Sequence, residues 1–228
     1  MTSFFSKAWN EWNKGPPIPY VEKELLSRIS NGLVLDLGCG TCRGMARFQK
    51  YGWEAVGIDI TIPPNRLRGV GDVIKGSGLF LPFREEVFDA IIIAQTLHHV
   101  SHPYYVLQEA KRCVKKTGYV LIGENVEDNV LLRLARWLYP THDGLTKRSD
   151  YFRLRKVTVR NMILKAGFKI LSEKTGIVTW IFWYEIASRL PILRPLSFLV
   201  KKIDEAFEKL LTNQHAQYYC ICSKSQYG

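Results

Sequence analysis

One stretch of this 228-residue chain constrains its fold more than any other: an apolar run that ends in a glycine-rich turn. The run covers residues 33–37, and Gly38 and Gly40 follow it directly. A second apolar run, at residues 55–58, ends in Asp59, 19 positions after Gly40. Glycines permit a tight turn between a buried strand and a helix, and an acid at about this spacing suits ribose hydroxyls. The pattern therefore predicts a nucleoside-binding site at the ends of two parallel strands.

Two other nucleotide-binding fingerprints do not fit this turn. The dinucleotide pattern G-x-G-x-x-G requires a third glycine, and the chain has Arg43 at that position. A phosphate-binding P-loop requires Gly-Lys followed by Ser or Thr, and no such sequence follows Gly40.

The pattern Asp36-x-Gly38-x-Gly40 resembles motif I of the class I S-adenosylmethionine-dependent methyltransferases. Later blocks extend the resemblance in register: Leu81-Pro82-Phe83, then Phe88-Asp89-Ala90-Ile91-Ile92-Ile93, then Leu97-His98-His99-Val100. Over residues 30–125 the chain is similar to the UbiE-like, type 11 methyltransferases that act on small molecules.

The resemblance implies methyl transfer as the activity and S-adenosyl-L-methionine as the cofactor. It places Asp36 where a carboxylate orders the turn and reaches the amino-acid end of the cofactor. Asp59 can accept two hydrogen bonds from the ribose hydroxyls. The expected cofactor-binding residues are Asp36, Gly38, Cys39, Gly40, Asp59, Ile60, Ser77, Gly78 and Gln95.

The sequence departs from the family pattern at three places. Cys42 stands where the family often has another glycine. Pro63-Pro64 and the short distance to Val70 leave little room for a helix after Asp59. The acid that often meets the adenine amino group is replaced by Gly76-Ser77-Gly78, since Asp72 lies too early. We therefore expect Ser77 and backbone groups to hold the adenine.

Apolar runs alternate with helical segments, which predicts an α/β protein with a doubly wound sheet covered on both faces. Strands are expected at residues 33–37, 55–59, 70–75, 88–94, 119–124, 168–175 and 217–223, and helices at 4–13, 20–30, 104–114 and 158–166. The resemblance implies a Rossmann-like methyltransferase fold of seven mostly parallel strands, the seventh antiparallel. It also implies a helical lid at residues 1–31, followed by the methyltransferase domain at 32–228.

Helical insertions of about residues 125–155 and 176–216 follow the fifth and sixth strands. Because ligands bind outside the carboxyl ends of such strands, we expect the insertions to form a substrate cap. The second insertion is rich in aromatic and apolar side chains, but Glu185, Arg189 and Arg194 leave no transmembrane span. A pocket wall, an interfacial membrane contact, a dimer face and additional core all remain open for it. The expected substrate residues are Tyr20, His99, Trp180 and Trp183.

The residues after the fourth strand are expected to face the transferred methyl group. A general base is needed only if the acceptor must lose a proton, and histidine titrates near neutral pH. His98 is the expected catalytic base because it is nearer the strand end than His99, which can instead turn toward helix packing. A packing role for His98 is the alternative. No metal is expected, because the histidines and the Cys39-x-x-Cys42 pair lack the spacing of a closed site.

Composition adds bounds on compartment and partners. The five cysteines favour a reducing compartment, and the N-terminus lacks the apolar core of a signal peptide, so we expect a cytoplasmic protein. The net charge of +11 is uneven, with +3 in residues 1–124 and +8 in residues 125–228. Methyl transfer to oxygen or carbon of a small-molecule or lipid-like acceptor is the first hypothesis. An RNA (tRNA) methyltransferase, suggested by the basic half, and a cofactor-binding protein without transferase activity are the alternatives.

Overall fold

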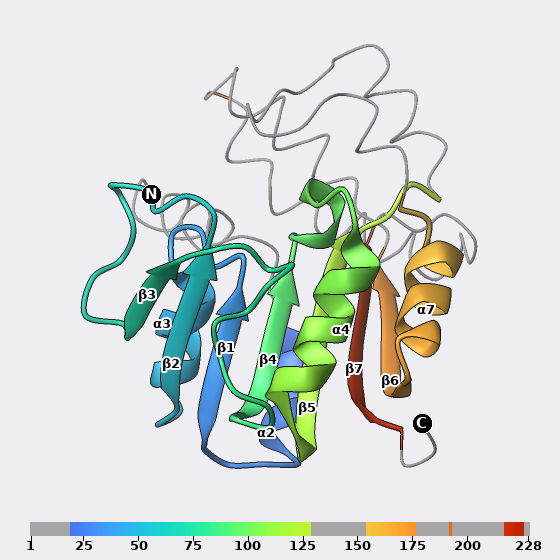
Figure 1. Ribbon diagram of the computed structural model, residues 1–228, viewed down its shortest axis with the longest axis horizontal. Helices are drawn as coiled ribbons and strands as arrows, with labels where there is room; N and C mark the ends of the chain where they lie inside the picture. Colours follow the sequence, from blue (N-terminus) through green and yellow to red (C-terminus); the bar gives the residue numbers. More distant parts are fainter. Residues whose placement is uncertain (1–18, 129–153, 177–191, 193–216, 226–228) are drawn as a thin grey trace.

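The computed structural model describes residues 19–128, 154–176, 192 and 217–225 (Figure 1). The expected helix at residues 4–13, most of the two insertions, and Trp180 and Trp183 lie outside these residues. The division into a lid at 1–31 and a domain at 32–228 stays a prediction.

Seven strands form one sheet in the order β3-β2-β1-β4-β5-β7-β6. Strands β1 to β5 run parallel to one another, and β7 runs antiparallel to both β5 and β6. The doubly wound, mostly parallel sheet with an antiparallel seventh strand is confirmed. The strands are β1 (Leu33–Leu37), β2 (Glu54–Asp59), β3 (Asp72–Lys75), β4 (Phe88–Ala94), β5 (Val114–Asn125), β6 (Phe168–Gly176) and β7 (Gln217–Lys224).

Helices cover both faces of the sheet, with α4 and α7 in front of it in the view of Figure 1. The described helices are α2 (Pro19–Leu26), α3 (Arg43–Gln49), α4 (Pro103–Cys113) and α7 (Lys156–Lys165), with a short 3-10 turn, η1 (Leu97–His99). Side chains alternate between the faces: Leu35 and Ile91 join the core under α4 and α7, whereas Val34 and Ile92 join the core that contains Met45 and Phe48 of α3. Burial on both faces explains the continuous apolar runs in the sequence.

Several element boundaries differ from the sequence prediction by one or more residues. Strand β3 begins at Asp72 rather than residue 70, because Gly71 has a φ of 105°, which lies outside the extended region of a strand. Strand β5 begins at Val114 rather than at residue 119: Val114 pairs with Phe88, Tyr119 pairs with Ala90, and the residues between them form a register shift. Helix α2 ends at Leu26 rather than at residue 30.

The segment between β2 and β3 contains no helix, as Pro63-Pro64 predicts. Helix α7 ends at Lys165, one residue before the predicted end, and Gly167 follows its C-cap Ala166 with a left-handed φ of 83°. None of the helices in the described part of the chain is long and apolar enough to cross a membrane.

Candidate cofactor and acceptor site

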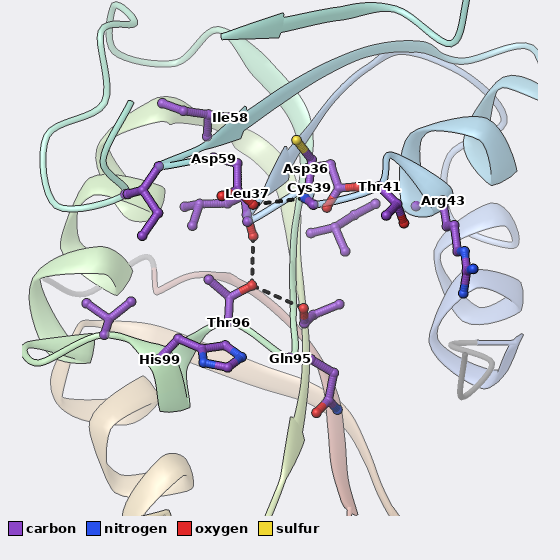
Figure 2. Close-up of a pocket in the computed structure, with 18 of the residues that line it drawn as sticks. Asp36, Leu37, Cys39, Thr41, Arg43, Ile58, Asp59, Gln95, Thr96 and His99 are labelled. Atoms are coloured by element: carbon purple, nitrogen blue, oxygen red, sulfur yellow. Dashed lines mark hydrogen bonds between the residues drawn. The ribbon is translucent and has the colours of Figure 1, made fainter. Parts of the chain in front are cut away.

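A cavity of about 630 Å³ lies at the carboxyl ends of β1, β2 and β4, where the strand order reverses (Figure 2). Such a reversal point is where open α/β sheets bind ligands, and the volume lies within the usual range for a ligand pocket. Every residue expected to bind the cofactor lines this one cavity: Asp36, Gly38, Cys39, Gly40, Asp59, Ile60, Ser77, Gly78 and Gln95.

The glycine turn after β1 has one position where only glycine fits. Gly38 has a φ of 80°, and a Cβ there would lie 2.3 Å from the hydroxyl oxygen of Thr96. The backbone N–H of Gly38 donates to the carbonyl of Ile58 at 2.8 Å, which ties the turn to β2. The absence of a side chain therefore lets the turn after β4 pack directly on the turn after β1.

Asp59 completes this turn from the end of β2. Its Oδ2 atom accepts the backbone N–H of Gly40 at 2.9 Å, and its Oδ1 atom accepts the N–H of Thr61 at 3.0 Å. The carboxylate is partly buried and lines the cavity, so it is held in place at the position expected for a ribose-binding acid.

Asp36 lies on the other side of the glycine turn and is buried. Burial raises the pKa of its carboxyl to about 7, against the opposing effects of a backbone hydrogen bond from Met45 and the nearby Arg47 guanidinium. A Cβ on Gly44 would lie 2.4 Å from Oδ2 of Asp36, so the first turn of α3 must be bare to receive this side chain. Sequence reasoning missed Gly44, although a glycine inside a helix is itself an unusual choice.

Cys42, which replaces a glycine of the family pattern, can be accommodated in this turn. Its backbone is left-handed, with a φ of 64°, and its side chain is buried in the core with Met45 and Phe48. It does not line the cavity. Cysteine in place of glycine therefore lowers the stability of the fold by about 1 kcal/mol through backbone strain. It does not fill the cavity, because its side chain points into the core.

The loop after β3 forms the end of the cavity assigned to adenine. Ser77, Gly78 and Leu79 line the cavity, as do Ile60 and Pro63. The hydroxyl oxygen of Ser77 accepts the N–H of Leu79 at 3.2 Å, so this loop is ordered by its own side chain. Asp72 is absent from the lining, in agreement with its exclusion on sequence grounds.

The turn after β4 supplies another part of the wall: Gln95, Thr96 and His99 line the cavity, and the Thr96 hydroxyl donates to the carbonyl of Leu37 (Figure 2). Gln95 has a left-handed φ of 56°, and Tyr219 of β7 lines the same end. His99 lines the cavity, in keeping with its expected place among the substrate residues, whereas His98, the expected catalytic base, is buried and bonds to Glu124. The 3-10 turn η1 rotates His98 into the core, and a strand-end position alone could not predict that rotation.

Helix α2 reaches the cavity through an ion pair that sequence reasoning missed. Glu22 and Arg47 line the cavity, with Nη1 of Arg47 at 2.8 Å from Oε1 of Glu22. Burial raises the pKa of the Glu22 carboxyl, and the Arg47 guanidinium opposes this rise. The pair joins α2 to α3 beside Asp36, although 25 residues separate its partners.

The remaining expected residues are not placed at the cavity. Tyr20 lies in α2, but its side chain is outside the described residues, as are Trp180 and Trp183. Within the part of the chain that the structure describes, no cluster of three His, Cys, Asp or Glu side chains could hold a metal ion.

Residues 35–122 match the family model described as "Methyltransferase domain". Among related proteins, an uncharacterized protein, MJ1123, of Methanocaldococcus jannaschii is 29% identical over 174 residues, covering 72% of this chain and 79% of that protein. The demethylmenaquinone methyltransferase of Roseiflexus castenholzii is 33% identical over 119 residues, covering 48% of this chain and 50% of the relative. A probable tRNA methyltransferase 9B of Homo sapiens is 32% identical over 120 residues, covering 51% of this chain and 23% of the relative.

Solved structures share the fold at low identity. The cyclase SpnF has a TM-score of 0.63 at 16% identity, covering 90% of this chain and 80% of that one. An S-adenosylmethionine-dependent methyltransferase from Archaeoglobus fulgidus has a TM-score of 0.59 at 17% identity, covering 90% and 93%. These neighbours bear out the Rossmann-like methyltransferase fold.

The sheet order, the glycine turn and the strand-end acid define a nucleoside-binding enzyme of the Rossmann-like class. With the methyltransferase domain matched over residues 35–122, the chain is identified as an S-adenosylmethionine-dependent methyltransferase. The cavity fits the cofactor in kind: Asp36 and Asp59 line it with carboxylates, which would suit the ammonium group and the ribose hydroxyls of S-adenosylmethionine. When bound, S-adenosylmethionine supplies a methyl group already activated on a sulfonium, so the enzyme's main task is to align the acceptor.

Proposed function

We propose that this enzyme transfers a methyl group to an oxygen or carbon atom of a small-molecule or lipid-like acceptor. One observation carries the proposal: the cavity of about 630 Å³ that the expected cofactor residues line is also lined by Thr96, His99 and Tyr219. Apolar walls with a few convergent polar groups are typical of small-molecule sites. The name of the demethylmenaquinone methyltransferase relative supports an acceptor that is not a polymer.

Each histidine has a separate part in this proposal. His99 lines the cavity, so it takes the acceptor proton when the acceptor is a hydroxyl. His98, the residue expected from the sequence, supports His99 from behind, with their ring centroids 4.0 Å apart. For a carbon acceptor that is already nucleophilic, alignment alone suffices and no base is required.

The test is a labelled-methyl screen with S-adenosylmethionine over lipid, small-molecule and tRNA fractions. We expect label in the organic-extractable fraction. His99→Asn should lower turnover of a hydroxyl acceptor by about 10²-fold and leave cofactor affinity within about threefold. His102→Asn is the matched control, because His102 precedes α4 and does not line the cavity. Label confined to tRNA would overturn the proposal.

RNA remains the second candidate acceptor because specific observations favour it. Residues 125–228 carry a net charge of +8, and a probable tRNA methyltransferase is among the relatives. An enzyme that binds tRNA through many phosphate contacts would lose affinity steeply as salt rises. A shallow salt dependence of tRNA binding between 50 and 200 mM salt, roughly the range over which phosphate contacts are lost, would reject this candidate.

We also propose where the protein acts, whether it contacts membranes and whether it forms dimers. The protein acts in the cytoplasm, it contacts membranes peripherally when its acceptor is lipid-like, and it can form a homodimer. The residues that motivate the last two, including Trp180 and Trp183, lie outside the described residues. Replacing both tryptophans with alanine should weaken binding to lipid vesicles if residues 176–216 form the contact.

A further inference from the structure

Glu124, near the end of β5, is fully buried, yet it does not line the cavity. Its carboxylate is saturated by one short segment of chain. Oε1 accepts the backbone N–H groups of Thr96 at 2.8 Å and Leu97 at 2.7 Å, and Oε2 lies 2.7 Å from Nδ1 of His98. A buried carboxylate with three such partners is held strongly, since hydrogen bonds to an ionised group are about twice as strong as neutral ones.

The bonds to Oε1 fix the backbone of the turn after β4. The backbone of this turn is strained, because Gln95 is left-handed. The N–H of Gln95 donates to the carbonyl of Gly123 at 2.7 Å, which holds the strained residue in place. Thr96 in turn presses on Gly38, and its hydroxyl is 3.0 Å from the carbonyl oxygen of Leu37. Glu124 therefore anchors a chain of contacts that ends at the cofactor turn.

The bond to Oε2 acts on a side chain instead. An ionised carboxylate only accepts, so it requires the proton of a neutral His98 to reside on Nδ1 and leaves Nε2 as the acceptor. The His98 ring packs on the His99 ring, and His99 lines the cavity. The two carboxylate oxygens thus serve two parts of the same turn: one its backbone, the other its histidine pair.

We propose that Glu124 is the positioning residue of this site: it locks residues 95–99 against the cofactor turn and fixes the tautomer of His98. The benefit to the acceptor rests on the proposed function, because His99 is the residue that the turn presents. The tautomer and the backbone bonds do not rest on it, so they can be measured without any acceptor.

The two carboxylate oxygens can be separated by substitution. Glu124→Gln keeps a carbonyl oxygen for the N–H groups of Thr96 and Leu97 but places an NH₂ group opposite Nδ1 of His98. The amide can only donate there, so His98 must move its proton to Nε2. Glu124→Ala removes both kinds of bond. Glu109→Gln is the matched control, because Glu109 also accepts a backbone N–H, that of Leu81 at 2.7 Å, away from the cavity.

The experiment is ¹⁵N NMR of the full chain, with imidazole nitrogen shifts for the tautomer, amide hydrogen exchange for the backbone, and titration with S-adenosylhomocysteine. We expect Nδ1–H in the wild type and in Glu109→Gln, and Nε2–H in Glu124→Gln with Thr96 and Leu97 amides still protected. Glu124→Ala should lose that protection and bind S-adenosylhomocysteine about tenfold more weakly, because the turn that packs on the cofactor turn is no longer fixed.

An unchanged His98 tautomer in Glu124→Gln would overturn the proposal, and so would unchanged amide protection in Glu124→Ala. If Glu124→Ala does not fold, the tautomer in Glu124→Gln decides alone. A wild type that binds no S-adenosylhomocysteine would contradict the cofactor site and not the role of Glu124, so the two failures are distinguishable.

Discussion

The Oδ2 atom of Asp59 accepts the backbone N–H of Gly40 at 2.9 Å, so the acid that ends β2 fastens the turn that ends β1. The two sequence signals that predict a nucleoside site are therefore in direct contact. Their separation of 19 residues reflects one turn, one helix and one strand folded back on themselves. A change at either residue should disturb the other.

Gly38→Ala tests the close contact between the turns after β1 and β4. The new Cβ would lie 2.3 Å from the Thr96 hydroxyl oxygen at a left-handed backbone position. We expect a loss of about 2–4 kcal/mol in the free energy of unfolding, from strain and overpacking together, and at least tenfold weaker S-adenosylhomocysteine binding. Urea unfolding and calorimetric titration measure the two effects.

Gly52→Ala is the matched control for that change. Gly52 has the same φ of 80°, but a Cβ there meets nothing within 4 Å. Gly52→Ala should lower the free energy of unfolding by about 1 kcal/mol, through backbone strain alone, and should bind S-adenosylhomocysteine as the wild type does. Equal losses in the two variants would show that the contact with Thr96 has no importance.

Asp36 predicts a pH dependence of stability. The folded carboxyl has a pKa of about 7, above its ordinary value of 3.8, so the folded state binds more protons than the unfolded chain between these values. Stability due to this group is therefore greatest below pH 4 and falls as pH rises toward 7, by at most roughly 4 kcal/mol. Urea unfolding of the wild type and of Asp36→Asn across pH 4–8 isolates the contribution of Asp36 to stability, since the amide of Asn does not titrate. Parallel curves for the two proteins would refute it.

The same carboxyl predicts how cofactor binding varies with pH. Because the ammonium group of the cofactor is attracted by the ionised form, S-adenosylhomocysteine affinity should rise with pH through about 7 and release a proton on binding. Titration calorimetry in buffers of different ionisation enthalpy detects that proton. Asp36→Asn should bind weakly with little pH dependence, and a wild-type affinity constant from pH 6 to 8 would contradict the assignment.

The Glu22–Arg47 pair predicts coupling between α2 and α3. A double-mutant cycle with Glu22→Gln and Arg47→Gln should give about 1 kcal/mol of interaction free energy in urea unfolding, because the pair is largely buried. The exposed pair Glu24–Arg28 on α2 and its flank is the control, at about 0.3–0.5 kcal/mol. A coupling no larger than that of the control would mean that α2 is not held by this pair.

The sequence was most informative where local pattern and global fold agree. Runs such as residues 88–94 are apolar on both faces, and the structure places that strand at the predicted bounds. The cofactor residues were predictable for a related reason: glycines and an acid at strand ends are dictated by backbone geometry within a few residues.

Contacts between distant segments were not predictable in this way. Glu22 and Arg47 look like ordinary surface charges in the sequence, and Glu124 like the polar end of a strand. Which of His98 and His99 faces the cavity depends on the 3-10 turn η1, and that turn is held by Glu124 from another strand. The Glu124 carboxylate, on another strand, sets which histidine faces the cavity, and such a contact leaves no periodic pattern in the sequence.

The most direct test of the cofactor site is calorimetric titration of the protein with S-adenosylmethionine and S-adenosylhomocysteine, beside Asp59→Ala and Asp72→Ala. Asp72 is the control because it is an exposed strand acid outside the cavity. We predict micromolar binding that Asp72→Ala retains and that Asp59→Ala weakens by at least about tenfold, the loss of one charged hydrogen-bonding group. No binding of either ligand to the wild type, or equal binding by Asp59→Ala, would contradict the account.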